Sequence, residues 1–223
     1  MKKMLLLLGL LNLSLNVFGE PVAELRKKAE EGDAVAQYNL GLSYINGRGA
    51  SKDESSGAKW IRKAARQGLA VAQHNLGWMY ENGKNVDADD KAAFKWYSKA
   101  AEQGFADSQA SLGWMYANGG GVSRDDKEAV KWCLKAAEQG NTKAQTNLGN
   151  HYYNGDGVPR NLVNAYAWYD MAASGGQKYV GKHRDALAKK LTTGQIAKAK
   201  ELSGELLKKI EAHKKAKKRN ESP

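Results

Sequence analysis

Few side chains in this chain have the types and the spacing that bond-making chemistry requires. Ser56 and Lys59 match the Ser-x-x-Lys pattern, in which a lysine activates a serine nucleophile. Neither Lys-Thr-Gly nor Ser-Asp-Asn, the motifs that complete such a site, occurs in the sequence, and the lysine recurs at a fixed interval as Lys95 and Lys131. We therefore interpret the match as a coincidence and predict no catalytic residue.

Histidines and acidic clusters do not predict a metal or cofactor site either. The four histidines lack the spacing of zinc ligands: His74, His151, His183 and His213. Asp87, Asp89 and Asp90 lie close together, but the downstream glutamate of a calcium loop is missing. His151 occupies the register of Met79 and Met115, where we expect a residue of the core or its edge.

Aromatic and amide side chains at repeated positions are the better candidates for binding. Trp78 and Trp114 are 36 residues apart, at one register, and tryptophan is enriched among residues that dominate binding energy. Stacked units would place the two side by side, roughly 20 Å apart or less. Amide and aromatic side chains at two neighbouring registers complete the predicted partner-binding set: Asn39, Asn75, Asn147, His74 and Tyr38. The asparagines have an alternative role, in which they only bridge helices.

These candidates belong to a repeat of 36 residues. A tryptophan, a Leu-Gly pair, a tyrosine and a paired alanine recur together four times, with the tryptophans at Trp60, Trp96, Trp132 and Trp168. Self-similarity at a fixed period of this length indicates a solenoid of stacked units. Solenoids present extended surfaces to partners, so the period itself favours binding over catalysis.

Each unit is predicted to be a helix, a loop and a second helix. In the second unit, apolar residues recur at helical spacing from Ala72 to Tyr80, and Asn82-Gly83 ends the helix. Asp89 is an N-cap residue type for the next helix, and its equivalents are Asp53, Asp125 and Asn161. We expect Trp96, with Ala100 and Ala101, on the inner face of the second helix, filling the space beside Gly77.

The repeated string Ala-Gln-x-Asn-Leu-Gly-x-x-Tyr-x-Asn-Gly resembles the Sel-one-like repeat, a relative of the tetratricopeptide repeat. Residues 82–86, 91–92, 95–97 and 99–104 match that family almost letter for letter. The resemblance implies an all-α fold, a right-handed α-solenoid of helix-turn-helix units with helical caps. It also implies a protein or peptide partner, whose backbone an asparagine of the first helix can bind.

On this reading the chain divides into eight segments. A signal peptide at 1–19 is followed by a capping half-repeat at 20–35, four repeats at 36–71, 72–107, 108–143 and 144–179, capping helices at 180–210 and a basic tail at 211–223. The first segment has a basic start and a short apolar core, which is typical of cleaved export signals and too short for a membrane anchor. We therefore expect a periplasmic or secreted protein with no transmembrane segment in the mature chain.

Positive charge is concentrated at the C-terminus. Residues 20–177 contain 19 basic and 19 acidic residues, whereas residues 178–223 contain 14 basic and 5 acidic. Such a run is either a solvated tail or an arm for an anionic surface. With a neutral body and no recognisable motif, the chain is not expected to bind nucleic acid.

The number of cysteines bears on a second possible function, the chemistry of β-lactams or cell-wall compounds. A cysteine-rich secreted branch of Sel-one-like proteins is linked to β-lactam binding or hydrolysis, and its repeats carry disulfides. This chain has only Cys133, at the register of Tyr97 and Tyr169, where we expect a half-buried apolar filler. The sequence therefore predicts a non-enzymatic interaction module of the bacterial envelope, with β-lactam or cell-wall compound chemistry as the alternative.

Overall fold

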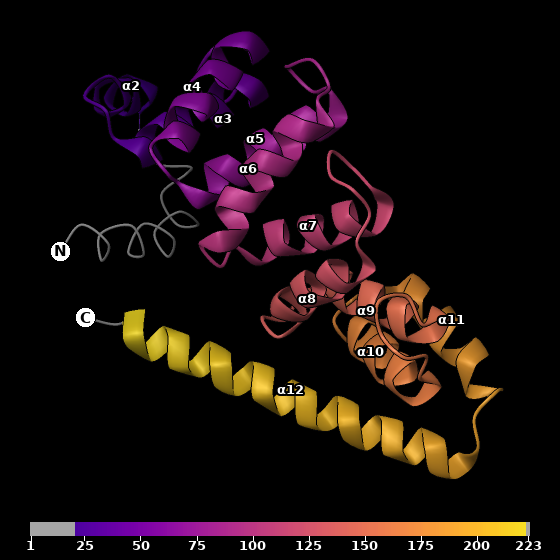
Figure 1. The fold of residues 1–223 in the computed structure, drawn as a ribbon. Helices are drawn as coiled ribbons and strands as arrows, with labels where there is room; N and C mark the ends of the chain where they lie inside the picture. Colours follow the sequence, from indigo (N-terminus) through magenta and orange to yellow (C-terminus); the bar gives the residue numbers. More distant parts are fainter. Residues whose placement is uncertain (1–20, 222–223) are drawn as a thin grey trace. The chain divides into compact units, whose positions relative to one another are not determined.

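A computed structural model describes residues 21–221, except for the side chains at positions 213, 217, 218, 220 and 221. The predicted signal peptide at 1–19 lies outside the described residues. Residues 21–221 form eleven α-helices and no strand (Figure 1). In chain order they are α2 (Val22–Glu30), α3 (Ala34–Asn46), α4 (Glu54–Arg66), α5 (Ala70–Asn82), α6 (Asp90–Glu102), α7 (Ala106–Asn118), α8 (Asp126–Ala137), α9 (Thr142–Asn154), α10 (Leu162–Ser174), α11 (Lys178–Ala188) and α12 (Thr193–Glu221).

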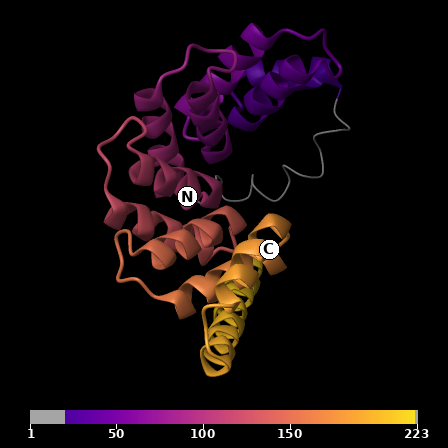
Figure 2. The same ribbon diagram turned by 90° about the vertical axis from the view of Figure 1, so that its right-hand side faces the viewer.

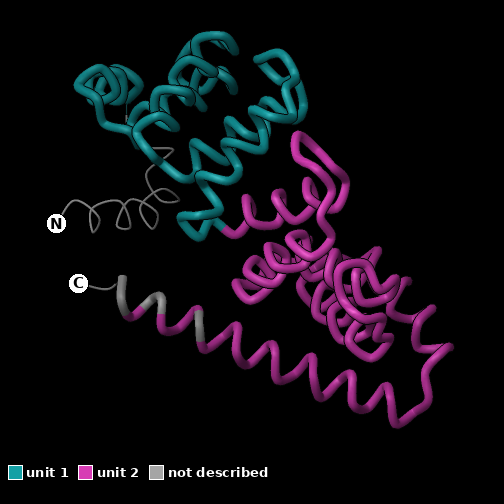
Figure 3. The backbone as a smooth tube through the Cα atoms, in the orientation of Figure 1, with its two compact units in different colours: residues 1–105 teal, residues 106–223 magenta. Residues whose placement is uncertain are grey.

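Consecutive helices pack in pairs: α3 with α4, α5 with α6, α7 with α8, and α9 with α10 (Figure 2). The pairs begin at residues 34, 70, 106 and 142, so the period of 36 holds and each pair starts two residues before the predicted segment. The predicted fold class, an all-α solenoid of helix-turn-helix units with helical caps, is confirmed. The chain forms two compact units, residues 1–105 and residues 106–223 (Figure 3).

Helix ends follow the local sequence signals. The predicted N-cap residues all accept hydrogen bonds from the backbone of the first turn: Asp53, Asp89, Asp125 and Asn161. Gly83 ends α5 with φ of 60°, a left-handed conformation that costs glycine nothing. The short loops between paired helices are therefore set by residues that the sequence identifies correctly.

Paired helices approach most closely at a glycine of the first helix. A Cβ on Gly77 would lie 2.8 Å from the Tyr97 ring, and one on Gly113 would lie 2.4 Å from Cys133 Sγ. The residue opposite the glycine is at most 4% exposed in every repeat: Ile61, Tyr97, Cys133 and Tyr169. The prediction that Trp96 fills the space beside Gly77 is therefore wrong, because the next residue along the helix does so. The expected half-buried position of Cys133 is wrong for the same reason, since its side chain is fully buried.

Three of the four periodic tryptophans lie half-buried beneath a lysine one turn later. Their lysine ammonium groups sit 3.9 to 4.8 Å above the indole rings, within the range of cation–π attraction, in the pairs Trp60–Lys63, Trp96–Lys99 and Trp132–Lys135. In the fourth repeat Met171 replaces the lysine, and Trp168 is buried in a cluster with Ile210 and Leu206 of α12. Helix α12 thus covers the tryptophan that the last repeat would otherwise leave half-exposed.

Helical caps lie at both ends of the described chain. Leu25 and Ala29 of α2 pack on Ala36 and Leu40 of α3, as expected of a capping half-repeat. At the other end, Thr192 and Gln195 form the predicted capping box at the start of α12. Helix α12 then continues to Glu221, so the predicted boundary between cap and tail at residue 210 is not a helix end. The lysines and alanines beyond Ile210 favour helix, which explains the continuation.

Buried glutamines donate to the preceding repeat or cap and accept from a second glutamine at the end of their own repeat. Gln73 Nε2 of α5 donates to the Ala65 carbonyl of the preceding repeat at 3.1 Å, and Gln73 Oε1 accepts from Gln103 Nε2 at 2.7 Å. Equivalent bonds recur, from Gln37 to the Ala29 carbonyl, from Gln67 to Gln37, from Gln145 to the Ala137 carbonyl, and from Gln139 to Gln109. This chain of amide bonds satisfies polar groups that burial would otherwise make costly.

Candidate functional site

The two tryptophans predicted to bind a partner are both exposed. Trp78 on α5 and Trp114 on α7 each expose 47% of their surface. An asparagine four residues later donates to each tryptophan carbonyl, Asn82 at 2.9 Å and Asn118 at 2.8 Å, so the two have the same local setting. Trp78 belongs to one compact unit and Trp114 to the other, and their side-by-side placement stays a prediction.

Three further predicted residues pack within unit 1. Asn75 Nδ2 donates to the Tyr38 hydroxyl at 2.7 Å, and burial raises the pKa of Tyr38. The His74 ring lies 5.3 Å from the Tyr97 ring and 5.2 Å from the Phe105 ring. These contacts give Asn75 the helix-bridging role that the sequence left open, and ligand contact by the three residues stays a prediction.

Asn39 and Asn147 occupy the same register as Asn75 but have other environments. Asn39 is half-buried, and its Oδ1 atom accepts no hydrogen bond from the described residues. Asn147 is hydrogen-bonded to the Cys133 thiol and also lines a pocket. Of the predicted residues, the structure brings two together at this pocket, namely Trp114 and Asn147.

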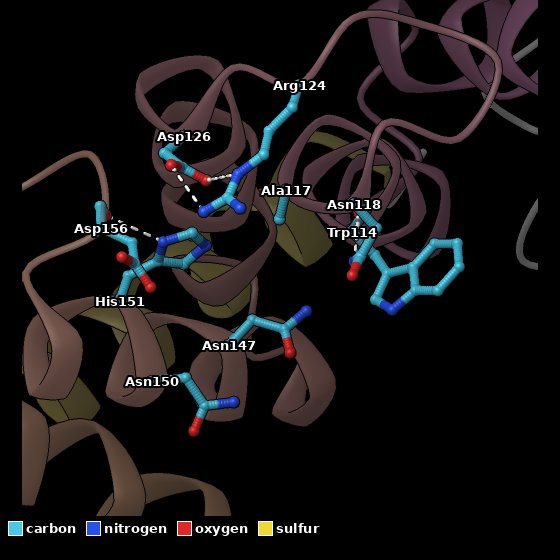
Figure 4. A pocket seen from close by; sticks show the side chains of 9 residues that line it. All are labelled: Trp114, Ala117, Asn118, Arg124, Asp126, Asn147, Asn150, His151 and Asp156. Carbon is cyan, nitrogen blue, oxygen red and sulfur yellow. Dashed lines mark hydrogen bonds and ion pairs between the residues drawn. The ribbon is translucent and has the colours of Figure 1, made fainter.

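This pocket, of about 350 Å³, lies in unit 2 between α7, the start of α8 and α9 (Figure 4). Its lining is Trp114, Ala117, Asn118, Arg124, Asp126, Asn147, Asn150, His151 and Asp156. We refer to it as the α7–α9 pocket. The loop that ends α7 contributes Arg124, and the loop that ends α9 contributes Asp156, so residues from two consecutive repeats converge on one cavity.

Ion pairing fixes the upper wall of the α7–α9 pocket in Figure 4. The Arg124 guanidinium donates to both Asp126 oxygens, at 3.0 and 2.9 Å, and this hydrogen bonding raises the pKa of Arg124. His151 is only 6% exposed, and its Nδ1 lies 2.9 Å from the Asp156 carbonyl oxygen. The histidine therefore holds the turn that carries Asp156, in keeping with the predicted core or edge position.

Asn150 forms the opposite wall. Its Oδ1 accepts a 2.7 Å hydrogen bond from the Tyr169 hydroxyl, which leaves its Nδ2 group to donate to a ligand. Burial raises the pKa of Tyr169 to about 12, so the hydroxyl stays protonated and keeps donating at neutral pH. Tyr169, buried beside Gly149, thereby orients the Asn150 amide at the pocket.

Sequence reasoning did not identify the polar residues contributed by the loops. One signal was present: the register of Asp156 carries Arg48, Lys84 and Gly120 in the other repeats, so only the last repeat has an acidic residue there. A search for such changes of charge at one register would have selected Asp156. The position of Arg124 depends on the path of a loop, which the helical period does not determine. Asp126 begins α8 at a register that carries Glu54 and Asp90 in other repeats, so it does not stand out in the sequence.

The arrangement supports hydrogen bonding and stacking rather than bond making. Ser56 Oγ donates to the N-cap carboxylate of Asp53 at 2.6 Å, which accounts for the serine of the Ser-x-x-Lys match. Cys133 is buried, and burial raises the pKa of its thiol to about 12, so it is inert as a nucleophile at neutral pH. Among the described residues no group of three histidine, cysteine or acidic side chains could hold a metal ion.

The exposed lysines of α12 form a second candidate surface. Lys200, Lys208, Lys209 and Lys215 are exposed on this helix, and beyond Ile210 no described side chain is buried. No helix within residues 21–221 combines the length and the hydropathy that crossing a bilayer requires.

Comparison with known proteins identifies the class. A model of the Sel1 repeat family matches residues 34–69, 70–105, 106–141 and 142–177. These four consecutive matches cover well over half of the chain, which therefore belongs to the Sel1 repeat family. The resemblance seen in the sequence is thus confirmed. A search of curated protein sequences finds no significant match.

Two solved structures are particularly similar. A Sel1 repeat protein from Oxalobacter formigenes is 38% identical, with a TM-score of 0.67, over 70% of this chain and 64% of that one. A protective antigen of uropathogenic Escherichia coli that displays an SLR fold is 30% identical, with a TM-score of 0.55, over 91% of this chain and 51% of that one. This chain thus spans between half and two thirds of the length of these relatives.

Proposed function

We propose that this Sel1 repeat protein is a non-enzymatic adaptor that holds a protein or peptide segment on the concave face formed by the first helices of its repeats. Sel1 repeat proteins are in general protein-interaction modules. The observation that carries the proposal is the pair Trp78 and Trp114, equally exposed at one register, with the second at the mouth of the α7–α9 pocket. Exposed tryptophan beside oriented amides is typical of binding hot spots.

Photo-crosslinking in living cells tests this proposal. A benzophenone amino acid at position 114 or 78 should capture one or two dominant proteins. The same group at position 95, an exposed lysine of the second-helix face, is the matched control and should capture neither. If positions 114 and 95 give identical patterns, or if a correctly folded protein captures nothing at 114, the adaptor function on this face is wrong.

The place of action that we propose is the bacterial envelope, periplasmic or secreted. Support comes only from residues 1–19, whose basic start and short apolar core are typical of an export signal. Fractionation of cells that express the full chain checks this. Recovery of a shortened protein outside the cytoplasm is expected, and full-length protein confined to the cytoplasm would contradict it.

A second function, contact with an anionic surface, is favoured by one observation. Helix α12 continues beyond the buried Ile210 as a segment rich in lysine, and the side chains described in this segment are exposed. Vesicles that contain anionic lipid should sediment the full protein, and high salt should release it because exposed charges are screened. A variant that ends at Ile210 should stay in the supernatant. Equal sedimentation of the two proteins would retire this idea.

The alternative of β-lactam binding or hydrolysis is not favoured. The branch of the family linked to it carries disulfides, whereas this chain has a single cysteine, which is buried and unpaired. A chromogenic β-lactam assay on the purified protein is a direct check, and turnover that depends on Ser56 would reverse this judgement.

A further inference from the structure

The charges of the α7–α9 pocket do not balance. Arg124 and Asp126 neutralise each other through two hydrogen bonds, at 3.0 and 2.9 Å. Asp156 Oδ2 accepts a 3.0 Å hydrogen bond from Asn154, a neutral amide, and none of the ion pairs within residues 21–221 includes Asp156. The two carboxylates and the one guanidinium of the lining thus leave one negative charge that no bonded cation offsets.

An aromatic platform stands at the mouth of the same pocket. The Trp114 indole is 47% exposed, and Figure 4 shows its ring at the rim, on the side away from Asp156. Long cationic side chains carry an apolar stem that packs on apolar and aromatic surface while the charged end stays in a polar setting. Such a stem would lie on the indole ring, with the charged end directed across the pocket toward the carboxylate.

Amide groups between these two features suit the backbone of a bound segment. Asn150 Nδ2 is left to donate, because the Tyr169 hydroxyl occupies its Oδ1. Asn118 Oδ1 is left to accept, because its Nδ2 donates to the Trp114 carbonyl at 2.8 Å. One donor and one acceptor of this kind can pair with the carbonyl and the N–H of an extended peptide.

From these observations we infer that the α7–α9 pocket binds an arginine or lysine side chain of the segment that the protein holds. The inference rests on the proposed adaptor function and names the chemistry of its partner. The remaining repeats do not offer the same chemistry, since Arg48, Lys84 and Gly120 occupy the register of Asp156. The cationic residue of the partner should therefore align with the fourth repeat.

Titration of the labelled full chain with capped pentapeptides tests the inference by nuclear magnetic resonance. The probe is acetyl-Gly-Ala-Arg-Ala-Gly-amide, and its control replaces arginine by citrulline, which has nearly the same shape without the charge. The arginine peptide should shift the Trp114 indole signal and bind about three- to tenfold more tightly than the citrulline peptide, as expected for one partly solvated charge pair. Free argininamide should bind more weakly than the peptide.

Two variants assign the effect. Asp156→Asn should abolish the preference for arginine over citrulline, whereas Asp87→Asn, which removes an exposed carboxylate from unit 1, should preserve it. Equal affinity for the two peptides in the unaltered protein, or a preference that survives Asp156→Asn, would overturn the inference. Argininamide binding as tightly as the peptide would also overturn it, since no segment would then be held.

Photo-crosslinking at position 114 separates this inference from the adaptor function. If a partner is captured equally by the unaltered protein and by Asp156→Asn, the adaptor function stands and the cationic pocket is wrong. Capture that falls with Asp156→Asn but persists with Asp87→Asn supports both.

Discussion

Cys133 is the one cysteine in the sequence, and the structure makes its thiol inaccessible. Its thiol is fully buried opposite Gly113 and is hydrogen-bonded to Asn147, a residue of the α7–α9 pocket. The buried cysteine thus contacts a side chain that lines this pocket. Its reactivity should report on unfolding rather than on function.

Burial of this thiol should make stability depend on alkaline pH. The pKa of Cys133 is raised from 9.0 to about 12, so between those values unfolded chains lose the proton and folded chains keep it. The stabilising effect is complete below pH 9.0 and is lost as the pH rises toward 12. The unfolding free energy of the unaltered protein should fall between about pH 8 and about pH 10. In Cys133→Ala this fall should be smaller by roughly 1 kcal/mol.

Urea unfolding of both proteins across this range measures the difference. Tyr169, whose pKa is also raised to about 12, contributes equally to the two proteins and cancels. Parallel pH profiles would contradict the burial effect. Rapid alkylation of the thiol under native conditions would do so independently.

Among the helices, close approach at glycine decides how each pair packs. A Cβ on Gly113 would lie 2.4 Å from Cys133 Sγ and 3.1 Å from the Ala129 carbonyl oxygen. Gly113→Ala should therefore lower the unfolding free energy by about 1–3 kcal/mol through overpacking. Adding Cys133→Ala removes the sulfur and should restore part of that loss, on the order of 1 kcal/mol.

Gly204→Ala, in α12, is the matched control, because a Cβ at this position would meet nothing within 4 Å. It should stabilise the protein by about 0.5–1 kcal/mol through helix propensity. Chemical denaturation of the four proteins compares these effects. If Gly113→Ala is as stable as Gly204→Ala, close approach does not limit this helix pair.

The number of helices, the ends of the repeat helices and the period could be predicted from the sequence because caps and glycines act locally. The face of the second helix that packs inward could not be predicted in this way. Trp96 recurs strictly and Tyr97 varies in type among repeats, yet Tyr97 is buried and Trp96 only half-buried. Strict recurrence of a residue type shows that the residue fits every repeat, not that it is buried. A tryptophan covered by a lysine can recur as strictly as a residue of the core. Of the site, Trp114 and Asn147 were predicted, whereas its charged residues, which lie in two loops and at the start of α8, were not.

For the molecule as a whole, α12 is the element that closes the last repeat. It buries Ala199 and Ile210, and it covers Trp168 and Met171. Ending the chain at Glu201 would remove most of this cover, while ending it at Ile210 would retain it. We expect the shorter variant to lose on the order of 4 kcal/mol from the unfolding of unit 2, since two or three apolar side chains become exposed.

The variant that ends at Ile210 should lose at most about 1 kcal/mol, because the side chains that the structure describes beyond it are exposed. Urea unfolding followed by tryptophan emission measures both effects, with a red shift expected for Trp168 only in the shorter variant. Equal stability of the two variants would mean that α12 does not cap the repeats.

The glutamine bonds carry a consequence for how such a chain can change in length. Donor and acceptor are eight residues apart where Gln73 meets the Ala65 carbonyl, and thirty apart where Gln103 meets Gln73. Both separations recur in other repeats, so removing or duplicating a block of 36 residues keeps them unchanged. A change of length by a whole repeat therefore preserves this hydrogen-bonding pattern.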